Sequence, residues 1–211
     1  MIIVPSLVLY LPFEGNAQDG SGKGNNGTIS GGVSSVAGKF GDALKFDGIN
    51  GSIDCGNGAS LNFGTDSFSY GLWLNISNYL TPYDIPLAKG GGSAGNTGYD
   101  MEVNGSDWGA FIADGSIQRG FYIPAGVLNT WTHFFIVVNK SLNTMFGYKN
   151  GLLENTKDIT GFGSVSSGSS LSVSNASYPI TGSLDEVCIF NRALAESDVR
   201  RVMVNMAPLG G

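Results

Sequence analysis

The chain has 211 residues, of which 33 are glycine and only 13% are charged, and its formal net charge at pH 7 is −6. This acidic balance excludes nucleic acid as an expected partner and disfavours anionic membranes, because both bind basic protein surfaces. The length fits one all-β domain, and a hydrophobic fraction of 42% allows a sizeable core.

The first predicted strand covers residues 7–13 and leads into a loop at 14–27 that is rich in glycine and in oxygen-bearing side chains. The apolar start of the chain, residues 1–12, has no basic region and no small-residue cleavage site, so we do not interpret it as a signal peptide. Two short strands are expected at 43–47 and 52–55, with a hairpin-like connection between them.

The next predicted strand, residues 68–76, alternates strictly between apolar and mixed positions. One set should face the core: Phe68, Tyr70, Leu72, Leu74 and Ile76. Trp73 lies on the opposite face, where we favour an architectural role. Residues 78–98 are interpreted as a long irregular section, and connections of that length are often functional.

In the second half of the chain, short apolar runs separated by turn residues predict further strands. They are expected at 99–104, 109–113, 119–123, 130–138 and 171–173, with a hairpin at 143–153. Asn150 and Gly151 suit the tight turn of that hairpin, because a type I′ turn needs positive φ at both positions. The chain closes with a strand that contains Val187 and Ile189, followed by a short helix from Ala193 to Met203.

Short strands separated by frequent turns indicate two packed antiparallel sheets, in a β-sandwich that is most consistent with a jelly roll. We find no internal repeat and no break in composition, and therefore expect a single domain over residues 1–211.

Seven motifs along the chain resemble the laminin-G-like, concanavalin A-like lectin/glucanase superfamily, and they occur in the order of that family. They are YLPFEG at 10–15, DGSGKGNNG at 19–27, GDALKFDG at 41–48, FSYGLW at 68–73, WTH at 131–133, YKNG at 148–151, and GSLDEVCIFNRAL at 182–194. The resemblance implies a concanavalin A-like jelly roll. It says less about function, because this fold carries lectins, adhesion modules, hydrolases and structural proteins.

The resemblance also implies a structural calcium ion between the N-terminal loop and the last strand. The matching ligands are Asp19, Asn26 and Asp185, with Glu14 as a fourth, and carbonyl oxygens of the loop would complete a shell of hard oxygens. The alternative is that Asp19 and Asn26 make turn hydrogen bonds and that Asp185 is an exposed acid at the strand end.

A carbohydrate-binding surface is the second candidate site, because aromatic rings stack on sugars while amides and carboxylates bond the hydroxyl groups. The residues proposed for it come from the sections expected to be loops: Tyr79, Tyr83, Asn96, Asn104, Asp107, Trp108 and Asp114. Trp108 receives the most weight, because it is expected in a turn, where a core indole is unusual.

Hydrolysis is the third candidate, and the sequence argues against it. The Glu-x-Asp-x-x-Glu pattern of the glucanase relatives is absent, and Asp100 with Glu102 forms only a lone alternating pair. His133, the single histidine, lies in a predicted buried strand and is expected to pack there. Cys55 and Cys188 leave open either one disulfide or two buried thiols.

The sequence therefore predicts a non-catalytic, lectin-like module that binds carbohydrate or another surface ligand. The alternative is a structural protein of a virion surface, or one that decorates a capsid, with other virion or surface proteins as partners. Both interpretations place the protein outside cells or on a particle. No run approaches the ~18 apolar residues that a membrane span requires, so membrane insertion is not expected.

Overall fold

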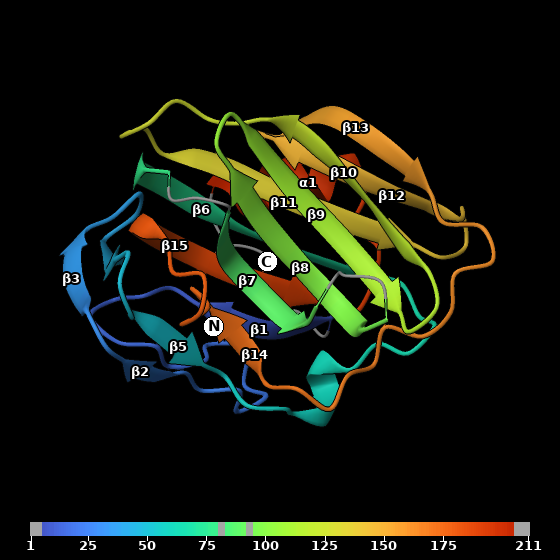
Figure 1. The fold of residues 1–211 in the computed structure, drawn as a ribbon, viewed down its shortest axis with the longest axis horizontal. Helices are drawn as coiled ribbons and strands as arrows, with labels where there is room; N and C mark the ends of the chain where they lie inside the picture. The colour runs from blue at the N-terminus through green and yellow to red at the C-terminus, as the bar shows by residue number, and fades with distance from the viewer. Residues whose placement is uncertain (1–5, 80–82, 92–94, 205–211) are drawn as a thin grey trace.

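The structure, a computed structural model, describes residues 6–79, 83–91 and 95–204. Their strands form two antiparallel sheets that pack face to face, and strands β7 to β10 cross in front of β6, β11 and β15 in Figure 1. This arrangement confirms the predicted β-sandwich with one short C-terminal helix.

Sheet A has eight strands. Its spatial order is β13 (Leu152–Asp158), β12 (Thr144–Lys149), β11 (Thr132–Asn139), β6 (Phe68–Asn78), β15 (Thr181–Phe190), β4 (Asp42–Asp47) and β3 (Val33–Ala37), and β1 (Leu7–Leu11) also pairs with β15. Sheet B has seven strands. Its order is β10 (Gln118–Pro124), β9 (Asp107–Asp114), β8 (Thr97–Asn104), β7 (Asp84–Gly90), β14 (Leu171–Val173), β5 (Ser52–Asp54) and β2 (Thr28–Ser30). A 3₁₀ turn spans Ala59–Leu61, and α1 spans Glu196–Val204.

The main core lies between the sheets and uses the alternating side chains predicted from the sequence. All five residues expected to face inward from β6 belong to it. The tight turn between β12 and β13 also has the predicted form, because φ is +51° at Asn150 and +74° at Gly151. The closing strand β15 pairs with β1.

Three parts of the fold differ from the sequence-based expectation. The section 78–98 is not irregular throughout, because Asp84–Gly90 forms β7 between β8 and β14. β4 and β5 do not form a hairpin: β4 pairs with β3 and β15 in sheet A, and β5 pairs with β2 and β14 in sheet B. The short strands β2 and β3 were also not predicted: β2 is exposed and has one apolar residue, Ile29, and β3 is only partly buried, with two serines at its centre.

A second hydrophobic cluster covers the outer face of sheet A, beneath α1. Its buried members are Leu7, Phe135, Val137, Tyr148, Cys188, Phe190, Leu194, Val199 and Val202. Cys55 and Cys188 are both free, buried thiols. The helix therefore covers part of the outer face of sheet A, which keeps a pocket beside Asn75, Ser77 and Gly182. Among the described residues, no helix covers the outer face of sheet B.

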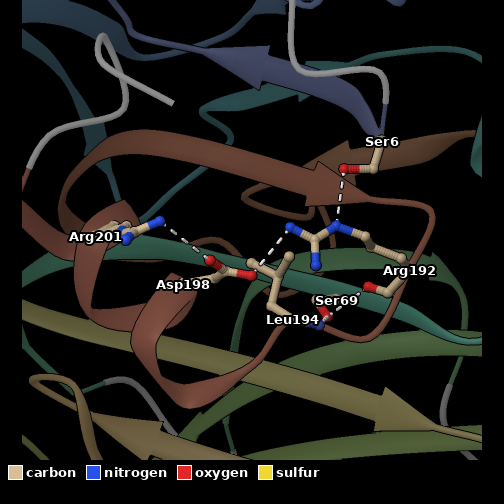
Figure 2. A network of polar contacts seen from close by, with 6 residues as sticks. All are labelled: Ser6, Ser69, Arg192, Leu194, Asp198 and Arg201. Carbon is tan, nitrogen blue, oxygen red and sulfur yellow. Dashed lines mark hydrogen bonds and ion pairs between the residues drawn. The ribbon is translucent and has the colours of Figure 1, made fainter. Parts of the chain in front are cut away.

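A polar network holds the segment before α1 against the strands (Figure 2). Arg192 donates through Nε to the hydroxyl of Ser6 at 3.1 Å and through Nη2 to the carboxylate of Asp198 at 3.0 Å. Ser69 donates its hydroxyl to the carbonyl of Arg192 at 2.8 Å and accepts the backbone N–H of Leu194 at 3.0 Å. These bonds connect β6, the start of the described chain and the helix.

Candidate functional site

The outer face of sheet B is built by strand alternation in β8, β9 and β10. The inward side chains of these strands belong to the main core: Tyr99, Met101, Val103, Trp108, Ala110, Ile112, Phe121 and Ile123. The alternate positions therefore point outward. They place two carboxylates, two glycines on neighbouring strands and two aromatic rings on one surface: Asp100, Glu102, Gly109, Phe111, Gly120 and Tyr122.

The strand register arranges these residues in two rows across the face. Asp100 is opposite Phe111, which is opposite Gly120. The neighbouring row joins Glu102 on β8, Gly109 on β9 and Tyr122 on β10. Each row therefore carries one carboxylate, one aromatic ring and one position without a side chain.

The two glycines make room for the aromatic rings to lie over the sheet. A Cβ atom at Gly120 would be 2.1 Å from a ring carbon of Phe111, and one at Gly109 would be 2.7 Å from the ring of Tyr122. The centroids of the two rings are 5.2 Å apart, in an edge-to-face arrangement. Phe111 and Tyr122 thus form one aromatic platform, with Tyr122 43% exposed to solvent.

The carboxylate of Glu102 lies beside this platform. The hydroxyl of Tyr122 donates to Oε2 of Glu102 at 3.2 Å, across Gly109. Burial raises the pKa of Glu102, and the hydrogen bond from Tyr122 partly offsets this by favouring the charged form. Glu102 is only half-buried, so its carboxyl group borders the rings where a ligand can reach it.

A second aromatic pair, Tyr83 and Tyr178, stacks with ring centroids 4.8 Å apart. A hydrogen bond with Tyr178 raises the pKa of Tyr83, with smaller contributions from burial, from Tyr178, Glu102 and Asp100. Tyr83 directly precedes β7, the neighbour of β8, so this pair lies at the β7 side of sheet B. Of the residues predicted to bind a ligand, Tyr83 lies at this side of sheet B, and Asn104 borders the platform, because its side chain is hydrogen-bonded with Tyr122.

Trp108 corrects the sequence-based interpretation. The turn before it consists of only Gly105 and Ser106, so Trp108 lies in β9 and points inward, where it is 1% exposed. Its indole packs against Phe134, with ring centroids 5.7 Å apart. Trp108 is a core residue and offers no surface for a sugar to stack on.

The other predicted ligand-binding residues are scattered. Asn104 and Asp107 are exposed at the tip of the β8–β9 hairpin, and Asn96 is exposed just before β8. Tyr79 donates its hydroxyl to the carbonyl of Gly126 at 3.1 Å. Asp114 accepts backbone N–H groups of Ser116, Ile117 and Gly163, which holds two loops together.

The four predicted calcium ligands make hydrogen bonds in two places: Asp19 and Asn26 inside the N-terminal loop, and Glu14 and Asp185 on backbone N–H groups of residues 39–42. Both carboxylate oxygens of Asp19 accept hydrogen bonds within residues 10–25, and Asn26 accepts the backbone N–H of Asp19 at 2.9 Å. Asp185 instead accepts the N–H groups of Lys39 and Phe40, at 2.8 Å and 3.0 Å. Among the described residues, no group of three or more His, Cys, Asp and Glu side chains could hold a metal ion.

Thermal unfolding tests the calcium prediction directly. Because Glu14, Asp19, Asn26 and one carboxylate oxygen of Asp185 already accept N–H bonds, we expect the melting temperature in about 1 mM calcium to match that in chelator. Magnesium at the same concentration controls for ionic strength. A rise of several degrees in calcium alone, absent from Asp19→Asn and Asp185→Asn, would restore the four-residue site.

His133 and Trp73 pack on the outer face of sheet A, as the sequence predicted. His133 is 1% exposed and stacks on Phe135, and burial lowers its pKa to about 3, so it is neutral. Trp73 is 6% exposed, and the ammonium of Lys39 lies 4.3 Å from its ring centroid. Both residues pack, and neither is available to a ligand.

Sequence reasoning missed Phe111 and Tyr122 as surface residues. The available signal was the alternation within residues 107–114 and 118–124, which assigns both rings to the face opposite the core. The sequence had already paired Asp100 with Glu102 on one strand face. The register that joins these strands could not be read from the sequence.

The profile of the concanavalin A-like lectin/glucanases superfamily matches residues 47–200 of the chain. The chain belongs to this superfamily. No relative among curated proteins matches the sequence. Among the described residues, no helix is long and apolar enough to cross a membrane.

Solved structures show the same fold at low sequence identity. The binding domain of paraclostridial mosquitocidal protein 1 has a TM-score of 0.76 at 20% identity, over 94% of this chain and 52% of that one. The binding domain of botulinum neurotoxin serotype G has a TM-score of 0.77 at 15% identity, over 94% and 50%. This superfamily member therefore spans about half the length of these two binding domains.

A third neighbour matches over nearly its whole length. It is domain 4 of AbnA, an extracellular GH43 arabinanase from Geobacillus stearothermophilus, solved in complex with arabinotriose. Its TM-score is 0.67 at 20% identity, and the match covers 94% of this chain and 98% of that one.

Proposed function

We propose that this superfamily member is a non-catalytic carbohydrate-binding module that acts outside cells and holds its ligand on the outer face of sheet B. The observation that carries the proposal is the platform of Phe111 and Tyr122, bordered by the carboxylate of Glu102. A pyranose ring has an apolar C–H face that packs on aromatic rings, and its hydroxyl groups donate to carboxylates.

The geometry suits binding from one side of the sheet. The exposed ring of Tyr122 offers contact area at low conformational cost, because a tyrosine side chain has only two rotatable angles. Glu102 accepts a hydrogen bond from Tyr122 and retains other lone pairs for a sugar hydroxyl. The solved neighbours, which include two binding domains and a domain in complex with arabinotriose, support a binding module without identifying a ligand for this chain.

Two other interpretations remain open to the same experiment. A glycoside hydrolase would need a pair of carboxylates with separate acid and base or nucleophile roles, and Glu102 already accepts from Tyr122. The virion-surface or capsid-decorating alternative stays a prediction, and the contacts of the described residues do not favour it. Hydrolysis of a bound oligosaccharide would support the enzyme, and silence across a glycan array would favour the structural protein.

Tyr122→Ala is expected to weaken binding of the glycans that score on an array by about 10- to 100-fold, because stacking contributes about 1–3 kcal/mol. Gly109→Ala is expected to weaken the same glycans, since its Cβ atom would meet the rings of both Tyr122 and Phe111. Affinities are measured by titration calorimetry with the array-selected oligosaccharide.

Ile49→Ala provides the control, because Ile49 is 75% exposed in a turn outside sheet B. It is expected to bind like the wild type. Undiminished binding by Tyr122→Ala, in a protein whose unfolding curve is unchanged, would remove the outer face of sheet B as the site.

A further inference from the structure

A pocket of about 240 Å³ adjoins the aromatic platform at the β10 edge of sheet B. It is lined by Phe111, Gln118, Arg119, Gly120 and Lys157. Phe111 belongs both to this pocket and to the platform, so the two surfaces are continuous. Lys157 comes from β13 of the other sheet, which lies along β10, where Asn155 donates to the carbonyl of Tyr122 at 3.0 Å.

Arg119 and Lys157 are the two cations of this pocket, and neither is in an ion pair with a described residue. Most other basic side chains of the described residues have a defined partner. Lys39 lies over Trp73, and the ammonium groups of Lys89 and Lys140 donate to backbone carbonyls. Lys149, Arg192, Arg200 and Arg201 are in ion pairs. Within the described part of the chain, neither Arg119 nor Lys157 has a carboxylate oxygen within 4 Å, and Arg119 donates only to the carbonyl of Gln118.

One acidic residue, Asp158, lies close enough for both cations to act on it. Its carboxylate is held by Thr160, which donates its backbone N–H and its hydroxyl at 2.8 Å and 2.7 Å. These bonds lower the pKa of Asp158, and the charges of Arg119 and Lys157 lower it further. With two positive groups and one negative group, the pocket keeps a positive balance on a chain whose net charge is −6.

The row of Asp100, Phe111 and Gly120 connects this positive pocket to the acidic side of the face. Asp100 is 3% exposed, so a ligand on this face meets the half-buried carboxyl group of the neighbouring Glu102 on one side, a ring in the middle and two cations at the other end. Carboxylates accept from sugar hydroxyls and repel anions, whereas Arg and Lys attract them. The guanidinium of Arg119 is also a planar fork that matches an oxyanion.

On the basis of the proposed function, we infer that the glycan held on sheet B is anionic, and that its carboxylate or sulfate group lies in the pocket between Arg119 and Lys157. The sugar ring that bears this group contacts Phe111, and the uncharged part of the chain extends over Tyr122 toward Glu102. The platform supplies affinity for sugar rings in general, and the pocket supplies selectivity for the charged substituent.

The test compares three tetrasaccharides that differ only in the substituent at C6: galactose, galacturonic acid and 6-O-sulfated galactose. The same comparison is made with the glucose series. In about 50 mM salt, we expect an anionic oligosaccharide of at least one series to bind about tenfold tighter than its neutral counterpart. A gain of this size is expected from two partly exposed ion pairs. The difference should shrink in about 0.5 M salt, where exposed charges are screened. The anionic oligosaccharide that binds tighter shows whether the pocket prefers a carboxylate or a sulfate group.

The double variant Arg119→Gln/Lys157→Gln is expected to lose this preference and to keep the neutral affinity. Lys23→Gln, which removes an exposed cation of the 14–27 loop, is the matched control and should keep the preference. A preference that survives the double variant overturns the inference, as does a neutral member that binds the wild type equally well.

The outcomes also separate the inference from the proposed function. If neutral oligosaccharides bind in a way that depends on Tyr122 and anionic ones bind no tighter, the inference is contradicted and the proposed function stands. If no member of either series binds the wild type and an array is also silent, the proposed function fails and the inference fails with it.

Discussion

Replacing Trp108 by alanine is expected to lower the free energy of unfolding by about 3–5 kcal/mol, because it leaves a large cavity in the core. The side chain is 1% exposed and contacts Phe134 across the sandwich. A Cβ atom at Gly126 would lie 2.8 Å from the far end of the indole, so the backbone there also packs against it. Urea unfolding followed by tyrosine fluorescence and circular dichroism measures the change.

Two variants make this result specific. Trp108→Phe keeps most of the apolar volume and should cost about 1–2 kcal/mol. Tyr122→Ala, on the exposed side of the same sheet, should stay within about 1 kcal/mol of the wild type. A Trp108→Ala protein with unchanged stability and lost glycan binding would instead return Trp108 to the ligand site.

As the pH rises from about 4 to about 7, we expect the free energy of unfolding to fall by about 3 kcal/mol, because the acid pair Asp185–Glu186 ionises at a higher pH in the folded protein than in the unfolded chain. Burial raises the pKa of Asp185 to about 6 and that of Glu186 to about 7. In the unfolded chain both acids ionise near pH 4, whereas in the folded protein they hold their protons longer. The stabilising contribution is therefore complete below about pH 4 and is lost as the pH passes the folded pKa values.

The groups that face this pair act in both directions. Tyr10 donates its hydroxyl to both oxygens of Glu186 at 3.0 Å, which favours the charged form. The N–H groups of Lys39 and Phe40 do the same for Asp185, and Glu14 raises the pKa values of both acids. Burial is the largest cause for each acid and decides the sign.

Glu186→Gln isolates the effect, because other carboxylates, such as Asp114, have lowered pKa values and stabilise in the opposite pH direction. The variant is expected to be more stable than the wild type by about 1–2 kcal/mol at pH 8 and equal to it at pH 4. Asp66→Asn, at an exposed carboxylate, is the control. Equal stability of Glu186→Gln and wild type at both pH values would contradict the raised pKa.

The sequence predicted the fold well where local patterns determine structure. The alternation from Phe68 to Ile76 assigned each side chain to its face, and Asn150–Gly151 identified a turn with two positive φ values. β7 was missed because Pro86 and the glycines after Lys89 are typical of loops. Its place between β8 and β14 depends on pairing with segments distant in sequence, which no local pattern encodes.

The candidate site was harder to predict for the same reason. Trp108 was assigned to a turn, because the two-residue length of that turn becomes clear only from the pairing of Asn104 with Asp107. Phe111 and Tyr122 come from different strands, and they meet because the register places each of them opposite a glycine. Single residues could be identified in the sequence, but the surface arises from the alignment of three strands.

The position of β15 has a consequence for how the chain folds. The last strand among the described residues, β15, is an interior strand of sheet A, between β6 and β4, and it also pairs with β1. The N-terminal half therefore cannot complete its sheet until residue 190 has left the ribosome. Pairing segments that are distant in sequence costs chain entropy before the stabilising contacts form. We therefore expect folding on the scale of milliseconds to seconds. Until then, β4 and β6 expose strand edges, which makes the growing chain dependent on protection from aggregation.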